Sequence, residues 1–422
     1  NKTIVVVNSG DGTAGGDGVD TVSVNHTNVP AALTALSVSG DEGNDILTVL
    51  ARAGTYTLTL SGGDNNDQLN AAATVAGPGS ILLNGNDGND SLIGGGDDDV
   101  LDGGPGDDTF LGNGGTDNVG GGALVSVDDR VLVPGTAAGD TIALSVDGSG
   151  FLIATVNAVT TTYRNFIGGA FNTAGIESLR VTGDAGNDAI TVSIASPNYD
   201  IHLSGGDNDD QINASATVAG PNAIFYNGNA GNDTLIGGGD DDTFDGGEGN
   251  DTFLGNGGTD NVGGGALTSL DDRILMPGTA AGDTISLSVD GSGFLIATVN
   301  AGTTTYRNFL GGAFSSAGVE AINVTANAGN DTINVAPLAN TAINIDGGSP
   351  VLPTVPGDGL NVNFAGTTGF LFTPGVPGAG VLTFTNRAQV SYVSIENQPF
   401  TSTTTVTASP ASPTVFGQSV TF

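Results

Sequence analysis

Two blocks of the chain, residues 85–120 and 228–263, each consist of four nine-residue units that follow one another without a gap. The first block reads GNDGNDSLI, GGGDDDVLD, GGPGDDTFL and GNGGTDNVG, and the second block has the same pattern. Position 6 is always Asp, and position 8 is always Leu, Phe or Val. Glycines allow the tight turn with positive φ that the first six residues require, and the last three residues suit a short strand. Two units therefore predict one coil of 18 residues, with position 8 pointing into a narrow core.

The aspartates at position 6 are the strongest candidate metal ligands. Each has a counterpart 18 residues further on, which the predicted coil places in the next turn of the stack. Ca²⁺ accepts about six to eight oxygen ligands in irregular geometry, which carboxylates and turn carbonyls can supply, whereas Mg²⁺ requires a strict octahedron. The predicted calcium ligands are Asp90, Asp99, Asp108, Asp117, Asp233, Asp242, Asp251 and Asp260.

These units resemble the G-G-x-G-x-D-x-U-x calcium-binding repeat of the RTX, or haemolysin-type, family. The resemblance implies a parallel β-roll in which the position-6 aspartates and the turn carbonyls of paired loops bind calcium. It also implies export from a bacterium. The wider chain is similar to large Gly-Asp-rich bacterial surface proteins, which mix such turns with longer β-helix coils.

Single copies of the unit also occur outside the two blocks. GGDGVDTVS at 15–23 matches fully, whereas ANAGNDTIN at 326–334 has lost both leading glycines. Turns favour Asp, Asn and Gly without any metal, so a calcium site and a metal-free turn are both open interpretations here. The additional candidate ligands are Asp20, Asp45, Asp67, Asp188, Asp210 and Asp331.

A longer repeat organises the whole chain. Residues 146–158 and 289–301 are identical, which gives a period of 143 residues. We predict three solenoid repeat units, 1–128, 129–271 and a divergent 272–400, followed by a linker, 401–422. This last segment resembles the opening strands of a bacterial immunoglobulin-like repeat.

The shorter spacing predicts the fold. Gly-Asp turns begin at residues 183, 205 and 228, with β-rich segments between them. Strands and turns at near-constant spacing are typical of a solenoid, in which each coil buries its apolar side against the next. We therefore predict an all-β, elongated parallel β-solenoid that combines β-helix coils with β-roll sections. The repeated VDGSGF segments predict inserted hairpins.

Composition limits the possible partners. The net charge is −37, from 45 acidic and eight basic residues, and only Glu42, Glu177, Glu248, Glu320 and Glu396 are glutamates. Such a charge repels itself unless cations neutralise it, and it disfavours nucleic acid and anionic membranes as partners. With 71 glycines the chain cannot be mainly helical, because Gly costs about 1 kcal/mol relative to Ala in a helix. No apolar run approaches the ~20 residues of a membrane span.

These features predict a calcium-stabilised structural module of a secreted, cell-surface bacterial protein, such as a stalk, an adhesin or a filament subunit. Head-to-tail self-association and a surface or polysaccharide ligand are further expectations. We predict no enzyme, because neither an HExxH nor a GxSxG motif is present. The alternative is a carbohydrate-binding or carbohydrate-active parallel β-helix, which would need acidic clusters outside the turns.

Overall fold

The computed structural model describes residues 3–8, 18–27, 33–74, 80–121, 128–166, 176–195, 199–217, 223–265, 271–310, 318–349 and 357–396. Within these ranges every regular element is a β-strand, and no helix is long and apolar enough to cross a membrane. The chain forms two compact units: unit 1 comprises residues 1–206 and 216–222, and unit 2 comprises residues 207–215 and 223–422. The predicted three repeats follow other boundaries and stay a prediction, and residues 401–422 lie outside the described ranges.

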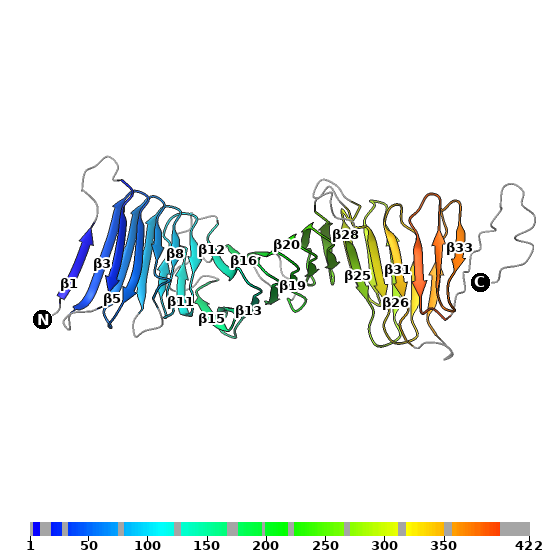
Figure 1. Cartoon of the computed structure of the whole chain (residues 1–422), viewed down its shortest axis with the longest axis horizontal. Helices are drawn as coiled ribbons and strands as arrows, with labels where there is room; N and C mark the ends of the chain where they lie inside the picture. The colour runs from blue at the N-terminus through cyan, green and yellow to red at the C-terminus, as the bar shows by residue number, and fades with distance from the viewer. Residues whose placement is uncertain are drawn as a thin grey trace, which may run out of the picture. The chain divides into compact units, whose positions relative to one another are not determined.

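Unit 1 is a stack of coils in which most successive strands alternate between two largely parallel sheets (Figure 1). The strands of the first sheet are β1 (Thr3–Asn8), β3 (Leu33–Glu42), β5 (Thr57–Asp64), β7 (Ile81–Asp87), β9 (Val100–Asp102), β11 (Gly115–Gly120), β13 (Thr141–Val146), β14 (Leu152–Val156), β15 (Val159–Arg164) and β17 (Ala189–Ser193). Those of the second sheet are β2 (Thr21–His26), β4 (Ile46–Arg52), β6 (Gln68–Asn70), β8 (Ser91–Ile93), β10 (Thr109–Leu111), β12 (Arg130–Thr136), β16 (Ser178–Ala185) and β18 (Asp200–Asp207).

Unit 2 has the same construction. One sheet contains β19 (Gln211–Asn213), β21 (Thr234–Ile236), β23 (Thr252–Leu254), β25 (Arg273–Pro277), β29 (Ala321–Thr325), β31 (Ala342–Asp346), β33 (Leu371–Pro374), β34 (Gly380–Thr383) and β35 (Val390–Val393). The other contains β20 (Ile224–Ala230), β22 (Thr243–Glu248), β24 (Thr259–Gly263), β26 (Thr284–Val289), β27 (Leu295–Val299), β28 (Gly302–Arg307), β30 (Thr332–Val335) and β32 (Gly359–Val362).

The core of each unit consists of columns of apolar side chains, because in-register parallel pairing places like positions above one another. In unit 1, Leu60 on β5 pairs with Leu83 on β7, which pairs with Leu101 on β9. All three are fully buried. The position-8 residues of both nonapeptide blocks are also 0% exposed: Leu92, Leu101, Phe110, Val119, Leu235, Phe244, Phe253 and Val262. The predicted all-β parallel solenoid is confirmed.

The predicted hairpins are part of the sheets. In unit 1, β13 and β14 are antiparallel, and the turn between them closes with a hydrogen bond from the Asp147 amide to the Phe151 carbonyl. A third strand, β15, returns antiparallel to β14 and pairs in parallel with β11, while β13 pairs in parallel with β17. Strands β26, β27 and β28 form the equivalent meander in unit 2. Each meander therefore separates two coils of one sheet by additional strands.

Candidate calcium-binding columns

The position-6 aspartates lie inside the turns and not on their surface. All eight are at most 2% exposed. Each carboxylate folds back beneath the glycine that opens its own unit, so that a Cβ added to Gly85 would lie 2.1 Å from Oδ2 of Asp90. The same contact occurs in the second block, where a Cβ on Gly246 would lie 2.2 Å from Oδ2 of Asp251. Glycine is therefore required at position 1 for lack of space, because the buried carboxylate occupies the side-chain volume.

Backbone amides connect these carboxylates from coil to coil. The amide of Asp90 donates to Oδ1 of Asp108 at 2.8 Å, and the amide of Asp108 donates to Oδ1 of Asp129, also at 2.8 Å. In the second block Asp233 donates to Asp251 in the same way at 2.9 Å. Each aspartate thus satisfies one buried amide of the preceding coil, which lies 18 residues earlier within a block.

The bonds extend into three long columns, each of which ends at a glutamate. We name each column by that glutamate. The Glu177 column in unit 1 consists of Asp20, Asp45, Asp67, Asp90, Asp108, Asp129 and Glu177. The Glu320 column in unit 2 consists of Asp210, Asp233, Asp251, Asp272 and Glu320. The Glu396 column, also in unit 2, consists of Asp283, Asp331, Asp358 and Glu396.

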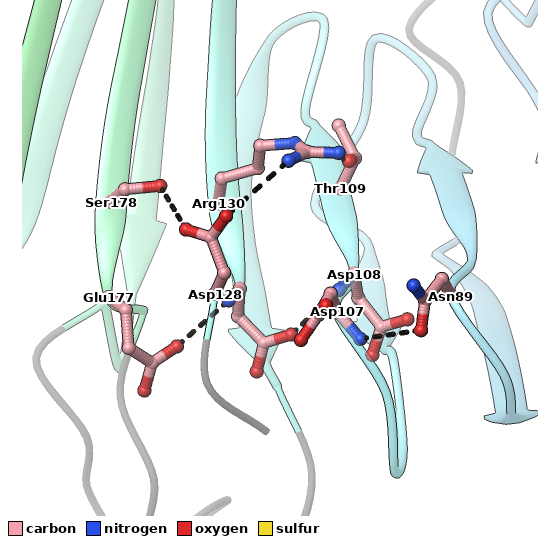
Figure 2. Close-up of polar contacts among 9 residues, drawn as sticks. Asn89, Asp107, Asp108, Thr109, Asp128, Arg130, Glu177 and Ser178 are labelled. Atoms are coloured by element: carbon pink, nitrogen blue, oxygen red, sulfur yellow. Dashed lines mark hydrogen bonds and ion pairs between the residues drawn. The ribbon is translucent and has the colours of Figure 1, made fainter.

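The terminal glutamate accepts the last amide of its column. Glu177 Oε2 lies 3.0 Å from the amide nitrogen of Asp129, although the two residues are 48 apart in sequence. Figure 2 shows Glu177 near Asp128 at this end of the column, with Asp108 farther away on the neighbouring coil. Asp128 there forms an ion pair with Arg130, whose guanidinium nitrogen lies 3.8 Å from Oδ2. Glu177 therefore takes the place that an aspartate has in the preceding coils.

A second set of side-chain bonds follows position 5 on the outside of the turns and runs in the opposite direction. The amide of Asn89 donates to Oδ1 of Asn66 at 2.8 Å, and the amide of Asp107 donates to Oδ1 of Asn89 at 3.0 Å (Figure 2). In unit 2 the amide of Asn250 donates to Oδ1 of Asn232 at 3.0 Å. Neighbouring turns are thus joined by side chains at two adjacent positions.

Two shorter columns lie on the other edge of the coils. Asp99 donates its amide to Asp117 at 2.9 Å, and Asp242 donates to Asp260 at 3.0 Å. A buried tyrosine follows each pair: Asp117 pairs in register with Tyr163, whose hydroxyl accepts the Gly112 amide at 3.1 Å. Tyr306 does the same in unit 2 with the amide of Gly255. Asp188 lies in a further pair of unit 1, in which it accepts the amide of Asp140 at 2.6 Å.

The second carboxylate oxygen divides the candidate ligands into two groups. In Asp99 and Asp242 it accepts a backbone amide, from Gly95 at 2.7 Å and Gly238 at 3.0 Å. In the other group this oxygen is buried and has no hydrogen-bond donor within the described ranges. That group consists of Asp20, Asp67, Asp90, Asp108, Asp117, Asp233, Asp251, Asp260, Asp331 and Asp358.

We call an Oδ2 atom without a hydrogen-bond donor among the described residues a bare oxygen. An ionised carboxylate with a bare oxygen is unfavourable in a buried environment. Burial, together with the charge of neighbouring carboxylates, raises the pKa of Asp108, Asp117 and Asp260 to about 8. A buried charge must be paired, protonated or bound to a metal. The ion pair between Arg130 and Asp128 uses a carboxylate that is not a member of any column, so it does not neutralise a column aspartate.

The oxygens near the bare carboxylate atoms fit a hard cation. The space beside Gly85 is bordered by Oδ2 of Asp90 and by the carbonyl oxygen of Gly103 in the next coil, 2.1 and 2.5 Å from a Cβ placed there. Gly228 has the same neighbours, Oδ2 of Asp233 and the Gly246 carbonyl. Two oxygens so close to one point repel each other unless a proton or cation lies between them, and carboxylate with carbonyl is the ligand set that Ca²⁺ prefers. No three acidic or histidine side chains converge in the described ranges, so main-chain carbonyls would complete each site.

Comparison with known families agrees with this geometry. Residues 84–122 and 227–265 match the model of the RTX calcium-binding nonapeptide repeat, which spans four copies. These two blocks are RTX repeats. RTX nonapeptide repeats bind Ca²⁺, so calcium is the cofactor of these two blocks. The blocks form a calcium-binding structural module. No curated protein matches the chain at a significant level.

Several members of the columns were not predicted from the sequence. Asp129 and Asp272 continue the columns just after the RTX blocks, within VDDR and LDDR, and Asp358 lies in a segment without nonapeptide pattern. The terminal glutamates were also missed. One signal was available, because three of the five glutamates end a column and two of them, Glu177 and Glu320, are related by the 143-residue period.

Proposed function

We propose that the chain is a calcium-stabilised spacer or stalk module of an extracellular protein, and that the column aspartates with a bare oxygen hold the ions. The observation that carries this proposal is the row of buried carboxylates, each with one oxygen bonded to the neighbouring coil and one without a donor. Bound cations would neutralise these groups and connect consecutive coils. RTX repeat proteins are typically secreted, which supports the extracellular assignment.

Thermal unfolding followed by circular dichroism tests the proposal directly. The chain is measured with a calcium chelator and then with millimolar calcium. Each site filled at about 100 times its Kd adds about 2.7 kcal/mol of stability, so several sites should raise the Tm strongly. Equal melting curves in the two conditions would refute a structural role for calcium.

A matched pair of variants tests the assignment of ligands. Asp108→Asn removes a carboxylate whose Oδ2 is bare, and Asp99→Asn removes one whose two oxygens both accept amides. We expect the first variant to lose part of the calcium-induced rise in Tm. The second should lower the Tm equally with and without calcium. The reverse result would contradict the division of the aspartates into two groups.

Two finer expectations from the sequence are part of the proposal. We infer that the module is not catalytic, because the RTX family is a structural calcium-binding module. A polysaccharide ligand stays a prediction, as does the alternative of a carbohydrate-active β-helix. Incubation with uronic-acid polymers and analysis of the products would test that alternative, and cleavage would overturn the assignment of a purely structural role.

A further inference from the structure

The Glu396 column lies entirely outside the two RTX blocks, yet it repeats their hydrogen-bonding pattern. The amide of Asp331 donates to Oδ1 of Asp358 at 2.8 Å, and the amide of Asp358 donates to Oε2 of Glu396 at 2.9 Å. Asp331 is 2% exposed and Asp358 is fully buried. The Oδ2 atoms of Asp331 and Asp358 are both buried without a hydrogen-bond donor in the described part of the chain.

The space next to Asp358 also has the oxygen pair seen in the RTX turns. A Cβ added to Gly347 would lie 2.9 Å from Oδ2 of Asp358 and 2.2 Å from the carbonyl oxygen of Ser394. Ser394 has a positive φ of 55°, a conformation that is uncommon for a residue with a side chain. A carboxylate oxygen and the carbonyl oxygen of the residue that follows β35 therefore border one buried space, as Asp90 and Gly103 do in the first RTX block.

The first member of the same column shows how this fold satisfies an aspartate without a cation. Oδ2 of Asp283 accepts the amide of Thr279 at 2.6 Å, and Oδ1 accepts the side-chain amide of Asn300, also at 2.6 Å. The turn thus supplies protein donors to both oxygens of Asp283. Asp331 and Asp358 have equivalent places in the column but lack such donors at Oδ2 among the described residues.

The turn that contains Asp331 differs from an RTX turn in one respect. Its first position is Ala326 and not glycine, so the residue that opens this turn carries a methyl group. Asp358 keeps a glycine, Gly347, at the corresponding place beside its own Oδ2. Asp358 is therefore the central residue of the candidate site, and Asp331 contributes from the preceding coil.

We propose that Asp358, Asp331 and the carbonyl of Ser394 form a calcium site outside the RTX repeats, with Glu396 as the positioning residue that holds the Asp358 amide. The inference rests on the proposed function, because it extends the same ligand chemistry to a third column. Burial, together with the charges of Asp331 and Glu396, raises the pKa of Asp358 to about 6. A cation at this place would neutralise the carboxylates of Asp358 and Asp331.

Equilibrium dialysis with radioactive calcium, on the whole chain, tests this site. The ions bound per chain are compared among the wild type, Asp358→Asn and Asp331→Asn. We expect each variant to lose one ion, and the double variant to lose the same single ion. Asp283→Asn is the matched control, since its carboxylate already has donors at both oxygens, and it should bind as many ions as the wild type.

The outcomes separate this inference from the proposed function. If Asp358→Asn and Asp331→Asn fold, as judged by circular dichroism, and bind as many ions as the wild type, the third-column site is refuted. A loss of bound ions in Asp251→Asn would show in that case that the RTX sites still hold calcium. A wild-type chain that binds no calcium would refute both proposals. If Asp358→Asn fails to fold, the number of calcium ions bound by Asp331→Asn decides whether the third-column site exists.

Discussion

At the scale of the residue, the two oxygens of a column aspartate have different tasks. Oδ1 of Asp108 accepts the amide of the preceding coil, while Oδ2 is buried beneath the glycine that opens the unit. A neutral carboxylic acid or a cation-bound carboxylate suits this position, whereas a free carboxylate does not. In the proposed calcium sites, protons and calcium would therefore compete for Oδ2.

This competition predicts that the stability of the chain depends on pH more strongly without calcium than with it. The pKa of Asp108, Asp117 and Asp260 is about 8 in the folded chain, against about 3.9 for an unfolded aspartate. Between these values the folded state binds more protons, so the stability of the calcium-free chain falls as the pH rises from about 4 to about 8. The rise in Tm caused by calcium should grow over the same range.

Melting curves from about pH 5 to about pH 9, with and without a chelator, check this expectation. A calcium-free Tm that increases with pH would contradict it.

The lack of room for a side chain at position 1 of the nonapeptide gives a second prediction. Gly246→Ala would place a Cβ 2.2 Å from Oδ2 of Asp251, which forces the buried carboxylate to move. We expect a loss of about 1–3 kcal/mol, the usual cost of overpacking a well-packed site. Gly239→Ala is the control from the same block, because Gly239 is exposed and has no atom within 4 Å of an added Cβ. Chemical denaturation with calcium present measures both variants, and equal losses would argue against the steric role.

At the scale of the element, the meanders end the short columns but do not interrupt the long ones. In unit 1, β15 replaces a coil strand beside β11 and places Tyr163 opposite Asp117. The same meander separates Asp129 from Glu177 by 48 residues while keeping them neighbours in space. A column therefore continues past an insertion when the next turn returns to the same edge.

The tyrosine at the end of a short column should stabilise the fold through its hydroxyl group. Tyr306→Phe leaves the Gly255 amide without its acceptor at a buried position, and an unsatisfied buried amide costs about 1–3 kcal/mol. Tyr226→Phe is the control, since the Tyr226 hydroxyl is buried without a partner in the described ranges and its removal should be neutral or stabilising. Urea unfolding of both variants distinguishes the two roles, and a neutral Tyr306→Phe would show that the hydroxyl bond is dispensable.

At the scale of the whole molecule, end strands offer a route to assembly. In the described part of unit 2, β33 pairs with β34 on one side, and Leu371 on β33 is 62% exposed. Unpaired strand edges are templates for pairing with another chain. The head-to-tail association predicted from the sequence would use such edges.

Sedimentation velocity over a range of protein concentrations, with calcium present, tests that association. We expect species larger than the monomer to increase with concentration. A single monomeric species at the highest concentration would exclude the filament form of the proposal, and the calcium-stabilised stalk would remain.

The sequence by itself determined the coil, because spacing alone decides which residues lie above one another. Asp90 and Asp108 are 18 residues apart, and this offset places them in adjacent turns. The wider offsets of 22 and 23 residues between Asp45, Asp67 and Asp90 also bring these residues into one column. The apolar residue at position 8 likewise identified the core, because it recurs at a fixed place in every unit.

Only the tertiary structure decided which carboxylates have a bare oxygen. Asp99 and Asp90 both occupy position 6 of a nonapeptide, yet Gly95 donates an amide to Asp99, and no donor from the described residues reaches Oδ2 of Asp90. The hydrogen bond between Asp129 and Glu177 also could not be predicted from the sequence, because no local spacing predicts a partner 48 residues away across a meander. Periodicity fixes neighbours along a regular stack, whereas hydrogen-bond satisfaction depends on atoms that only the folded chain brings together.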